Sequence, residues 1–168
     1  MNILRLANVN DINLLQFWDT QEHIINCHND TNEIIDIDWN EEINNPIPEI
    51  QNYIIQNENE AIGVIQIQDI FNEPYQYWSS WSDFGPDIYA IDIWIGNVDY
   101  LNKGFGTKAM LEAIRICFED KKANCIVIDP LASNLKAIKF YQKLGFEFLY
   151  NHYFEDDYCS ILMLKNNQ

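Results

Sequence analysis

The stretch that decides the fold is GFGTKAMLEAIRICFED at residues 104–120, followed by CIVI at 125–128 and NLKAIKFYQKLG at 134–145. In the first and third segments, apolar residues recur at the three- to four-residue spacing of a helix that buries one face. The run at 125–128 is apolar without a break, which is typical of a strand buried on both faces. A helix, a strand and a second helix in this order predict an α/β or α+β domain with one central sheet.

Further elements are expected on both sides of this stretch. Period-two patterns and turn residues predict strands at residues 3–6, 53–55, 61–70, 88–95, 146–150 and 158–164. Helices are expected at 12–18, with Asp11 as N-cap, and at 20–27. Residues 36–48 give no clear pattern, although two prolines favour a loop at their end. No repeat or linker divides the chain, so we expect one domain over residues 1–168.

Charge is the most informative bulk property of the chain. Its 26 acidic and 10 basic residues give a formal net charge of −16. Such a surface repels phosphates and anionic lipids, which disfavours nucleic acid and membranes as partners, and it attracts cations. No apolar run approaches the roughly 20 residues needed to span a bilayer. We read no signal peptide at the N-terminus and expect the cytoplasm. The four cysteines and three histidines lack ligand spacing, so no metal site is expected.

Two glycines, Gly104 and Gly106, stand at the start of the helix predicted at 104–120, in the segment from Asn102 to Thr107. They let the backbone approach a ligand, and the first N–H groups of a helix, at the positive end of its dipole, suit a pyrophosphate. Lys103 adds a mobile charge and Thr107 a hydroxyl. The ending of a Walker A loop and the third glycine of a dinucleotide site are both absent. Alone, such a pair of glycines more often marks a plain tight turn.

A second motif makes a phosphate site the better interpretation of the two glycines than a plain turn. Asn134, Ala137, Ile138 and Tyr141 stand at helical spacing, which by itself also fits a packed core. Together with residues 103–107, however, this segment resembles motifs A and B of the GNAT acetyltransferases. The resemblance implies a central, mixed, mostly antiparallel twisted sheet of six to seven strands, flanked by about four helices.

The same resemblance implies acetyl-CoA as cofactor, with its pyrophosphate on the glycine loop and its pantetheine arm beside the Asn and the Tyr. Leu101 stands where the family usually has Gln or Arg. The residues implied in cofactor binding are Ile93, Trp94, Ile95, Lys103, Gly104, Phe105, Gly106, Thr107, Asn134, Ala137 and Tyr141.

Residues 91–96 and 100–107, with Asp129-Pro130 before the second motif, are most similar to the aminoglycoside 6′-N-acetyltransferases. That group also lacks Gln or Arg at the Leu101 position. The resemblance is weak at residues 26–52, where the group often carries a substrate-contacting tryptophan. It implies acetylation of the 6′-amine by direct attack in a ternary complex. A GNAT enzyme for another amine (a polyamine, a siderophore precursor or a peptide N-terminus) and a non-catalytic acyl-CoA-binding module are the alternatives.

Acetyl transfer needs a neutral amine, so a group must bind the ammonium cation and accept a proton. Asp92 resembles the carboxylate with this role, and its apolar neighbours would raise its pKa. A structural Asp or a plain cation anchor is the alternative. Tyr141 resembles the family's tyrosine that donates a proton to the departing CoA thiolate. A hydroxyl packed in the core is the alternative. Backbone N–H groups at 93–95 are candidates for polarising the thioester carbonyl.

A small polycationic amine is the expected substrate. Its predicted contacts are Trp78, Trp81, Asp83, Asp87, Asp92 and Asp129. Carboxylates beside aromatic faces bind ammonium groups by charge and cation–π contact. Packing or dimer contacts for the tryptophans, and turn capping for Asp129, are the alternatives. Asp36, Asp38, Trp39, Glu41 and Glu42 are weaker candidates for the opposite wall. We expect a monomer or a homodimer.

Overall fold

The computed structural model describes residues 3–28, 37–72, 85–154 and 156–166. Its strands are β1 (Leu4–Leu6), β2 (Ile50–Asn57), β3 (Glu60–Asp69), β4 (Ile88–Trp94), β5 (Cys125–Ile128), β6 (Glu147–Phe154) and β7 (Asp157–Lys165). They form one seven-stranded sheet in the order β1-β2-β3-β4-β5-β7-β6. Every neighbouring pair is antiparallel except β4 and β5, which are parallel. The predicted mixed, mostly antiparallel sheet is confirmed.

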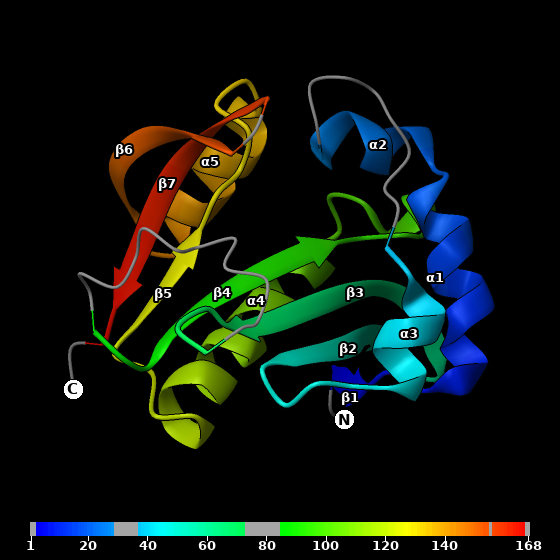
Figure 1. Ribbon diagram of the computed structural model, residues 1–168. Coiled ribbons are helices and arrows are strands. Elements are labelled where there is room, and N and C mark those ends of the chain that lie inside the picture. Colours follow the sequence, from blue (N-terminus) through cyan, green and yellow to red (C-terminus); the bar gives the residue numbers. More distant parts are fainter. Residues whose placement is uncertain (1–2, 29–36, 73–84, 155, 167–168) are drawn as a thin grey trace.

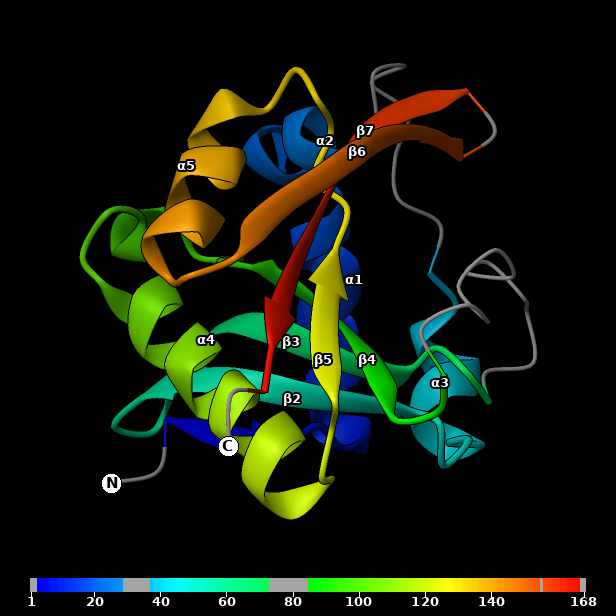
Figure 2. The same ribbon diagram turned by 90° about the vertical axis from the view of Figure 1, so that its left-hand side faces the viewer.

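Helices cover both faces of the sheet. The α-helices are α1 (Ile12–Asp19), α2 (Glu22–His28), α3 (Trp39–Asn44), α4 (Phe105–Arg115) and α5 (Leu135–Lys143). Figures 1 and 2 show α4 on one face and α1 and α3 on the other, while α5 lies beside the β6–β7 hairpin. Short 3₁₀ turns lie at Val9–Asp11 and Val98–Tyr100.

Alternation along the strands assigns the side chains to these two faces. Ile54, Val64 and Trp94 stand side by side in register and pack under Trp18 and Trp39 of α1 and α3. The opposite face is an isoleucine layer that packs against the small residues and Met110 of α4. Each face of the sheet therefore packs against its own apolar core.

The parallel strands β4 and β5 pair over only part of their length. Their register runs from Ile88↔Cys125 to Ala90↔Val127, but β4 continues to Trp94. The two strands therefore part after Ala90, which Figure 1 shows as a widening space between them. The last residues of β4 face this space without a β5 partner among the described residues.

The main differences from the sequence prediction concern helices. The unassigned stretch 36–48 contains α3, which is only six residues long and buries Trp39. The long helix predicted at 104–120 begins at Phe105 and turns π-helical at Ile116–Asp120. Arg115 lies at this change and forms ion pairs with three acidic residues, the nearest contact being 3.0 Å.

Asp11 is the N-cap residue of α1, as predicted, but its side chain makes no capping hydrogen bond to that helix. Asn8 instead caps the 3₁₀ turn that precedes α1, and its Oδ1 accepts from Asn10 N at 3.0 Å. The Asp11 carboxylate accepts from the Arg5 guanidinium at 2.7 and 2.8 Å and from Asn8 N at 2.9 Å. These bonds hold the pKa of Asp11 below its ordinary value despite its burial. Asp11 thus ties β1 to the start of α1.

Candidate active site

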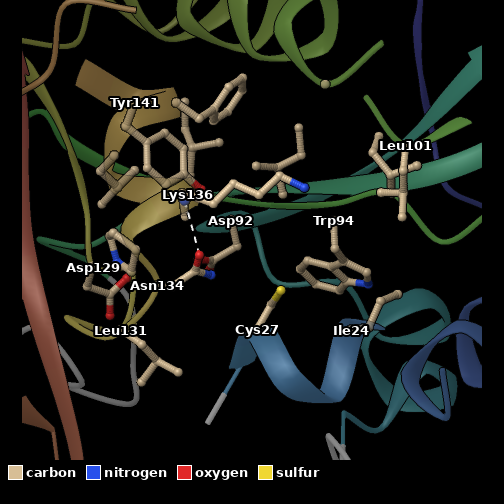
Figure 3. Close-up of a pocket in the computed structure, with 18 of the residues that line it drawn as sticks. Ile24, Cys27, Asp92, Trp94, Leu101, Asp129, Leu131, Asn134, Lys136 and Tyr141 are labelled. Atoms are coloured by element: carbon tan, nitrogen blue, oxygen red, sulfur yellow. Dashed lines mark hydrogen bonds between the residues drawn. The ribbon is translucent and has the colours of Figure 1, made fainter. Parts of the chain in front are cut away.

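A cavity of about 790 Å³ lies where β4 and β5 part. Its walls come from the end of β4, the loop after β5, the N-terminal end of α4, one side of α5, and α2. Figure 3 shows side chains from these elements pointing into the same space. A cavity of this size is typical of a small-molecule site.

One end of the cavity is built from main chain. The loop before α4 turns through left-handed backbone at Asn102 (φ 58°) and Gly104 (φ 85°), and Leu101, Gly106 and Thr107 also line the cavity there. Left-handed residues followed by a helix N-terminus direct several N–H groups to one side, where the helix dipole adds positive potential. A Cβ on Gly104 would meet no atom within 4 Å, and one on Gly106 would meet only Phe140 Cζ at 4.0 Å. This open, electropositive loop fits the diphosphate of a coenzyme A molecule.

Two residues of the predicted loop do not line the cavity. The Lys103 ammonium lies 5.9 Å from the centroid of the Tyr100 ring, and Phe105 packs edge-on against the same ring at 5.2 Å. The lysines that do line the cavity are Lys136 and Lys143, both on α5. Sequence reasoning missed both, because their spacing matches any exposed helix face.

The side chain of Asp92 enters the cavity from β4. It is half-buried, and its Oδ2 accepts a hydrogen bond from Gln68 Nε2 at 2.9 Å. Burial, followed by the charge of Asp129, raises its pKa to about 7. The predicted elevation of the Asp92 pKa therefore has two causes, of which the sequence indicated only the first. A carboxylate with a pKa near 7 can exchange protons at neutral pH.

Two further carboxylates line the cavity. Asp129 follows β5, where the next residues are held against β7 by the bond from Ser160 N to Pro130 O at 2.8 Å. Asp157, the first residue of β7, is the third. Sequence reasoning missed Asp157, whose only signal was the acidic run at a hairpin turn. The three carboxylates make the lining of the cavity electronegative, most strongly where Asp92 and Asp129 interact.

Tyr141 lines the cavity from α5. Its side chain is buried against Phe140 and Phe146. Burial, followed by the charges of Asp92 and Asp129, raises the pKa of its hydroxyl, which therefore keeps its proton at neutral pH. Figure 3 shows Tyr141, Asp92 and Asn134 grouped on one side of the cavity.

Asn134 begins α5 and has a structural role there. Its Oδ1 accepts a hydrogen bond from Ala137 N at 3.0 Å, which caps the helix. Asn134 and Ala137 both line the cavity, as predicted for residues beside a pantetheine arm. The cap fixes where α5 starts and so where Tyr141 stands two turns later.

The opposite wall comes from α2 and the end of β4. Ile24 and Cys27 line the cavity, and Figure 3 shows them beside Trp94. His23 Nε2 donates to the carbonyl oxygen of Ile95 at 2.9 Å, which fastens α2 to the segment after β4. Sequence reasoning gave these α2 residues no role, because nothing in a seven-residue helix indicates what it faces.

Among the predicted substrate contacts that the structure describes, Asp87 is not brought to the cavity. Asp87 has φ 66° in the turn before β4, at the opposite end of that strand from Trp94, and is not among the lining residues. Trp78, Trp81, Asp83 and Asp36 lie outside the described residues.

The remaining weak candidates belong to α3 and do not line the cavity either. Asp38 caps the helix by accepting from Glu41 N at 3.0 Å. Trp39 is buried against Trp94, and Glu42 contacts the sheet. Within the described ranges, no group of three or more His, Cys, Asp or Glu side chains is placed to hold a metal ion. Among the helices described, none is long and apolar enough to cross a membrane.

Comparisons with known proteins agree with this geometry. Residues 8–154 match the family model of the acetyltransferase (GNAT) domain. An aminoglycoside N(6′)-acetyltransferase type 1 of Klebsiella pneumoniae is 28% identical over 160 residues, which span 86% of this chain and 73% of that protein. The structure of AAC(6′)-Ib in complex with ribostamycin and coenzyme A superposes with a TM-score of 0.84 at 27% identity, covering 97% of this chain and 92% of the other.

A second crystal structure of AAC(6′)-Ib, in complex with coenzyme A and kanamycin, gives a TM-score of 0.82 at 25% identity and covers 97% and 94% of the two chains. A kanamycin resistance protein of Rhizobium radiobacter is 38% identical over 72 residues, 43% of this chain and 65% of that protein. The resemblance read from residues 103–107 and 134–146 is thereby confirmed. The chain belongs to the GNAT acetyltransferase family.

Proposed function

We propose that this protein is an acetyl-CoA-dependent N-acetyltransferase that acetylates the 6′-amine of an aminoglycoside by direct attack in a ternary complex. The observation that carries the proposal is a single cavity with an amide-lined end for an anion and a carboxylate-lined end for a polycation. The relatives described above, whose complexes contain coenzyme A with ribostamycin or kanamycin, support the same pair of ligands.

The chain has residues for both ligands. The loop of residues 101–107 and the first turn of α4 would hold the diphosphate, with Lys136 and Lys143 adding positive charge along α5. Asn134 and Ala137 would border the pantetheine arm. When bound, acetyl-CoA supplies an activated acetyl group as a thioester.

Asp92 is the proposed base. Its carboxylate attracts the substrate ammonium, and a pKa of about 7 lets it take up the proton that the amine must lose. Asp129 and Asp157 bind further ammonium groups of the substrate, which orients the reacting amine. A substrate with one positive charge would use only part of this end, so the geometry favours a polycation.

Tyr141 is the proposed acid. Because the pKa of its hydroxyl is raised, Oη carries a proton at neutral pH and can donate a hydrogen bond to a sulfur atom that gains negative charge. The N–H groups at residues 93–95, beyond the point where β4 and β5 part, are the proposed donors to the carbonyl oxygen. Cytoplasmic location, and the monomer or homodimer, stay predictions.

A matched pair of antibiotics tests the proposal. Neomycin carries an amine at the 6′ position and paromomycin a hydroxyl, and the two are otherwise alike. We expect purified protein with acetyl-CoA to release free CoA and add one acetyl group with neomycin, but not with paromomycin, as read by thiol release and mass spectrometry. Equal acetylation of both would contradict the 6′ assignment. Acetylation of spermidine alone would favour a polyamine substrate, and CoA binding without turnover on any amine would favour the binding module.

A further inference from the structure

A row of polar side chains crosses three strands on the face covered by α1 and α3. Asn52 on β2 stands opposite Gln66 on β3, and Gln66 stands opposite Asp92 on β4. This row runs directly beside the apolar row that ends at Trp94, and Asn52 and Gln66 are only 8% and 7% exposed. Buried side-chain amides are normally hydrogen-bonded, so each amide in this row should have a partner.

The row is part of a continuous chain of hydrogen bonds from α3 to the cavity. At one end, Glu42 Oε2 accepts from Asn52 Nδ2 at 2.8 Å and from Gln66 Nε2 at 3.0 Å. In the middle, Asn52 Oδ1 accepts from Gln66 Nε2 at 2.9 Å, and Gln66 Oε1 accepts from Gln68 Nε2 at 2.5 Å. At the other end, Gln68 Nε2 donates to Asp92 Oδ2 at 2.9 Å.

The carboxylates at the two ends of this series of hydrogen bonds, Glu42 and Asp92, determine which way each amide between them is turned. An ionised carboxylate only accepts hydrogen bonds, so Glu42 turns the amide nitrogen of Gln66 toward itself. The carbonyl oxygen of Gln66 then faces Gln68 and draws the amide nitrogen of Gln68 to that side. That same nitrogen reaches Asp92. Reversing Gln66 would bring the oxygen of Gln68, which cannot donate, to the Asp92 carboxylate.

We propose that Glu42, Gln66 and Gln68 form a positioning relay in which Glu42 fixes the amide orientation that holds one oxygen of Asp92. The relay leaves the other Asp92 oxygen for the substrate amine, and it favours the ionised form because Gln68 donates to that form. The effect of the relay on catalysis rests on the proposed function. The hydrogen bonds of the relay do not, because they exist in the folded protein without any ligand. Glu42 touches neither ligand and acts only through the amides.

Other titratable groups share the cavity with Asp92, so the test must separate their effects from that of the relay. From the surrounding elements, Asp129, Asp157, Tyr141, Lys136, His23 and Cys27 line the same cavity. None of them is changed in the variants below. The charge of residue 42 is itself a competing effect, since replacing an anion by a cation lowers a nearby carboxyl pKa. Amide reversal acts in the opposite direction, and this difference in sign makes the relay testable.

The variant Glu42→Lys places a donor where the relay requires an acceptor. We expect Gln66 to reverse and the pKa of Asp92 to rise by about 0.5 to 1 pH unit, despite the added positive charge. Glu41→Lys makes the same change of charge one residue earlier on α3, where the side chain contacts only Asn45 among the bonds described. It should leave the pKa of Asp92 unchanged or lower it. Glu42→Gln keeps an oxygen acceptor and should behave like the natural protein.

The primary measurement is a carbon-13 NMR titration of the protein labelled at Asp carboxyl groups, with the Asp92 signal assigned by its loss in Asp92→Asn. The secondary measurement is the pH dependence of kcat/KM with neomycin, whose acidic limb should move with the NMR midpoint. A Glu42→Lys midpoint equal to or below that of Glu41→Lys would overturn the relay. Because the titration needs no turnover, a protein that acetylates nothing can still support or refute it.

A second variant guards against misfolding of Glu42→Lys. Gln68→Leu removes the donor to Asp92 while keeping an apolar stem on the same strand, and it should raise the Asp92 midpoint by about 1 pH unit or more. Affinity for CoA should stay within about twofold in both variants, since the amide loop lies on another element. An unchanged midpoint in Gln68→Leu, with CoA affinity intact, would also overturn the proposal.

Discussion

The two ends of the cavity are made from different parts of the chain. The end at residues 101–107 is main chain, shaped by left-handed backbone at Asn102 and Gly104 and by the first turn of α4. The other end consists of side chains, with Asp92 arriving from β4 and Asp129 from the loop after β5, while Asp157 of β7 also lines the cavity. One end depends on a local conformation and the other on the tertiary arrangement of distant segments.

This difference explains how a protein of net charge −16 can offer a site to an anion. Amide N–H groups and a helix dipole act within about one turn of the helix and do not require surface lysines. The carboxylate end, in contrast, adds to the field of the whole protein and so attracts polycations from a distance. Substitutions should therefore be able to disable either end without disturbing the other.

The largest expected effect comes from Asp92→Asn. Because the amide cannot accept the proton of the substrate, we expect kcat/KM with neomycin to fall by about 10² to 10⁴-fold. The Kd for CoA should stay within about twofold, since the amide loop is unchanged. Steady-state thiol release and calorimetry would measure the two quantities. A parallel loss of CoA affinity would show that the two ends are not independent.

Gly106→Glu should instead weaken the binding of CoA. A carboxylate in the first turn of α4 repels a diphosphate, and we expect the Kd for CoA to rise by about 100-fold. The fold should not suffer, because an acidic residue is favourable at a helix N-terminus and the nearest atom to a new Cβ is Phe140 Cζ at 4.0 Å. Gly106→Ala, with the same backbone change and no charge, is the control and should bind CoA nearly as the natural protein does.

The raised pKa of Asp92 should also appear in stability. The folded state prefers the protonated form, so natural protein loses stability as the pH rises from about 4 through the folded-state pKa of about 7. Asp92→Asn should not lose stability in this way, because an amide does not ionise. We expect it to be more stable than natural protein by about 1 to 3 kcal/mol at pH 8, and equally stable near pH 4. Urea unfolding at the two pH values would measure the difference, and the same difference at both would exclude titration as its cause.

Asp129→Asn should have the smallest effect. It removes one contact of the cation end, and we expect KM for neomycin to rise by about 10-fold with CoA affinity unchanged. Since the charge of Asp129 is the second cause of the raised pKa of Asp92, the acidic limb of the pH profile should also move to lower pH. An unchanged KM together with reduced thermal stability would instead favour the turn-capping role of Asp129.

Sequence patterns predicted the elements that have a clear period. The helices α4 and α5 and the buried strand β5 lie within one or two residues of expectation, apart from the π-helical end of α4. The strand β2 was underestimated, since 53–55 was expected and Ile50–Asn57 is observed. Its polar residues interrupted the apolar pattern because Asn52 belongs to the hydrogen-bonded row rather than to a core.

The local parts of the candidate site were predicted from neighbouring residues, whereas its tertiary parts were predicted only where the family resemblance reached them, as at Asp92 and Asp129. Gly104, Gly106 and Asn134 were recognisable because their role depends on neighbours within a few residues. Asp157 was not, since only the pairing of β7 with β5 brings it to the cavity. Lys103 carried a plausible charge but lies on Tyr100, a rotamer choice that no motif encodes.

The exposed thiol of Cys27 has a practical consequence. Cys117, Cys125 and Cys159 are buried, and burial raises the pKa of the first two, which makes them poor nucleophiles. Cys27 is the one exposed cysteine among the four, and it lines the cavity. An electrophilic fragment that enters this space would therefore react at a single position. Growing such a fragment toward either end offers a route to covalent inhibitors of the enzyme.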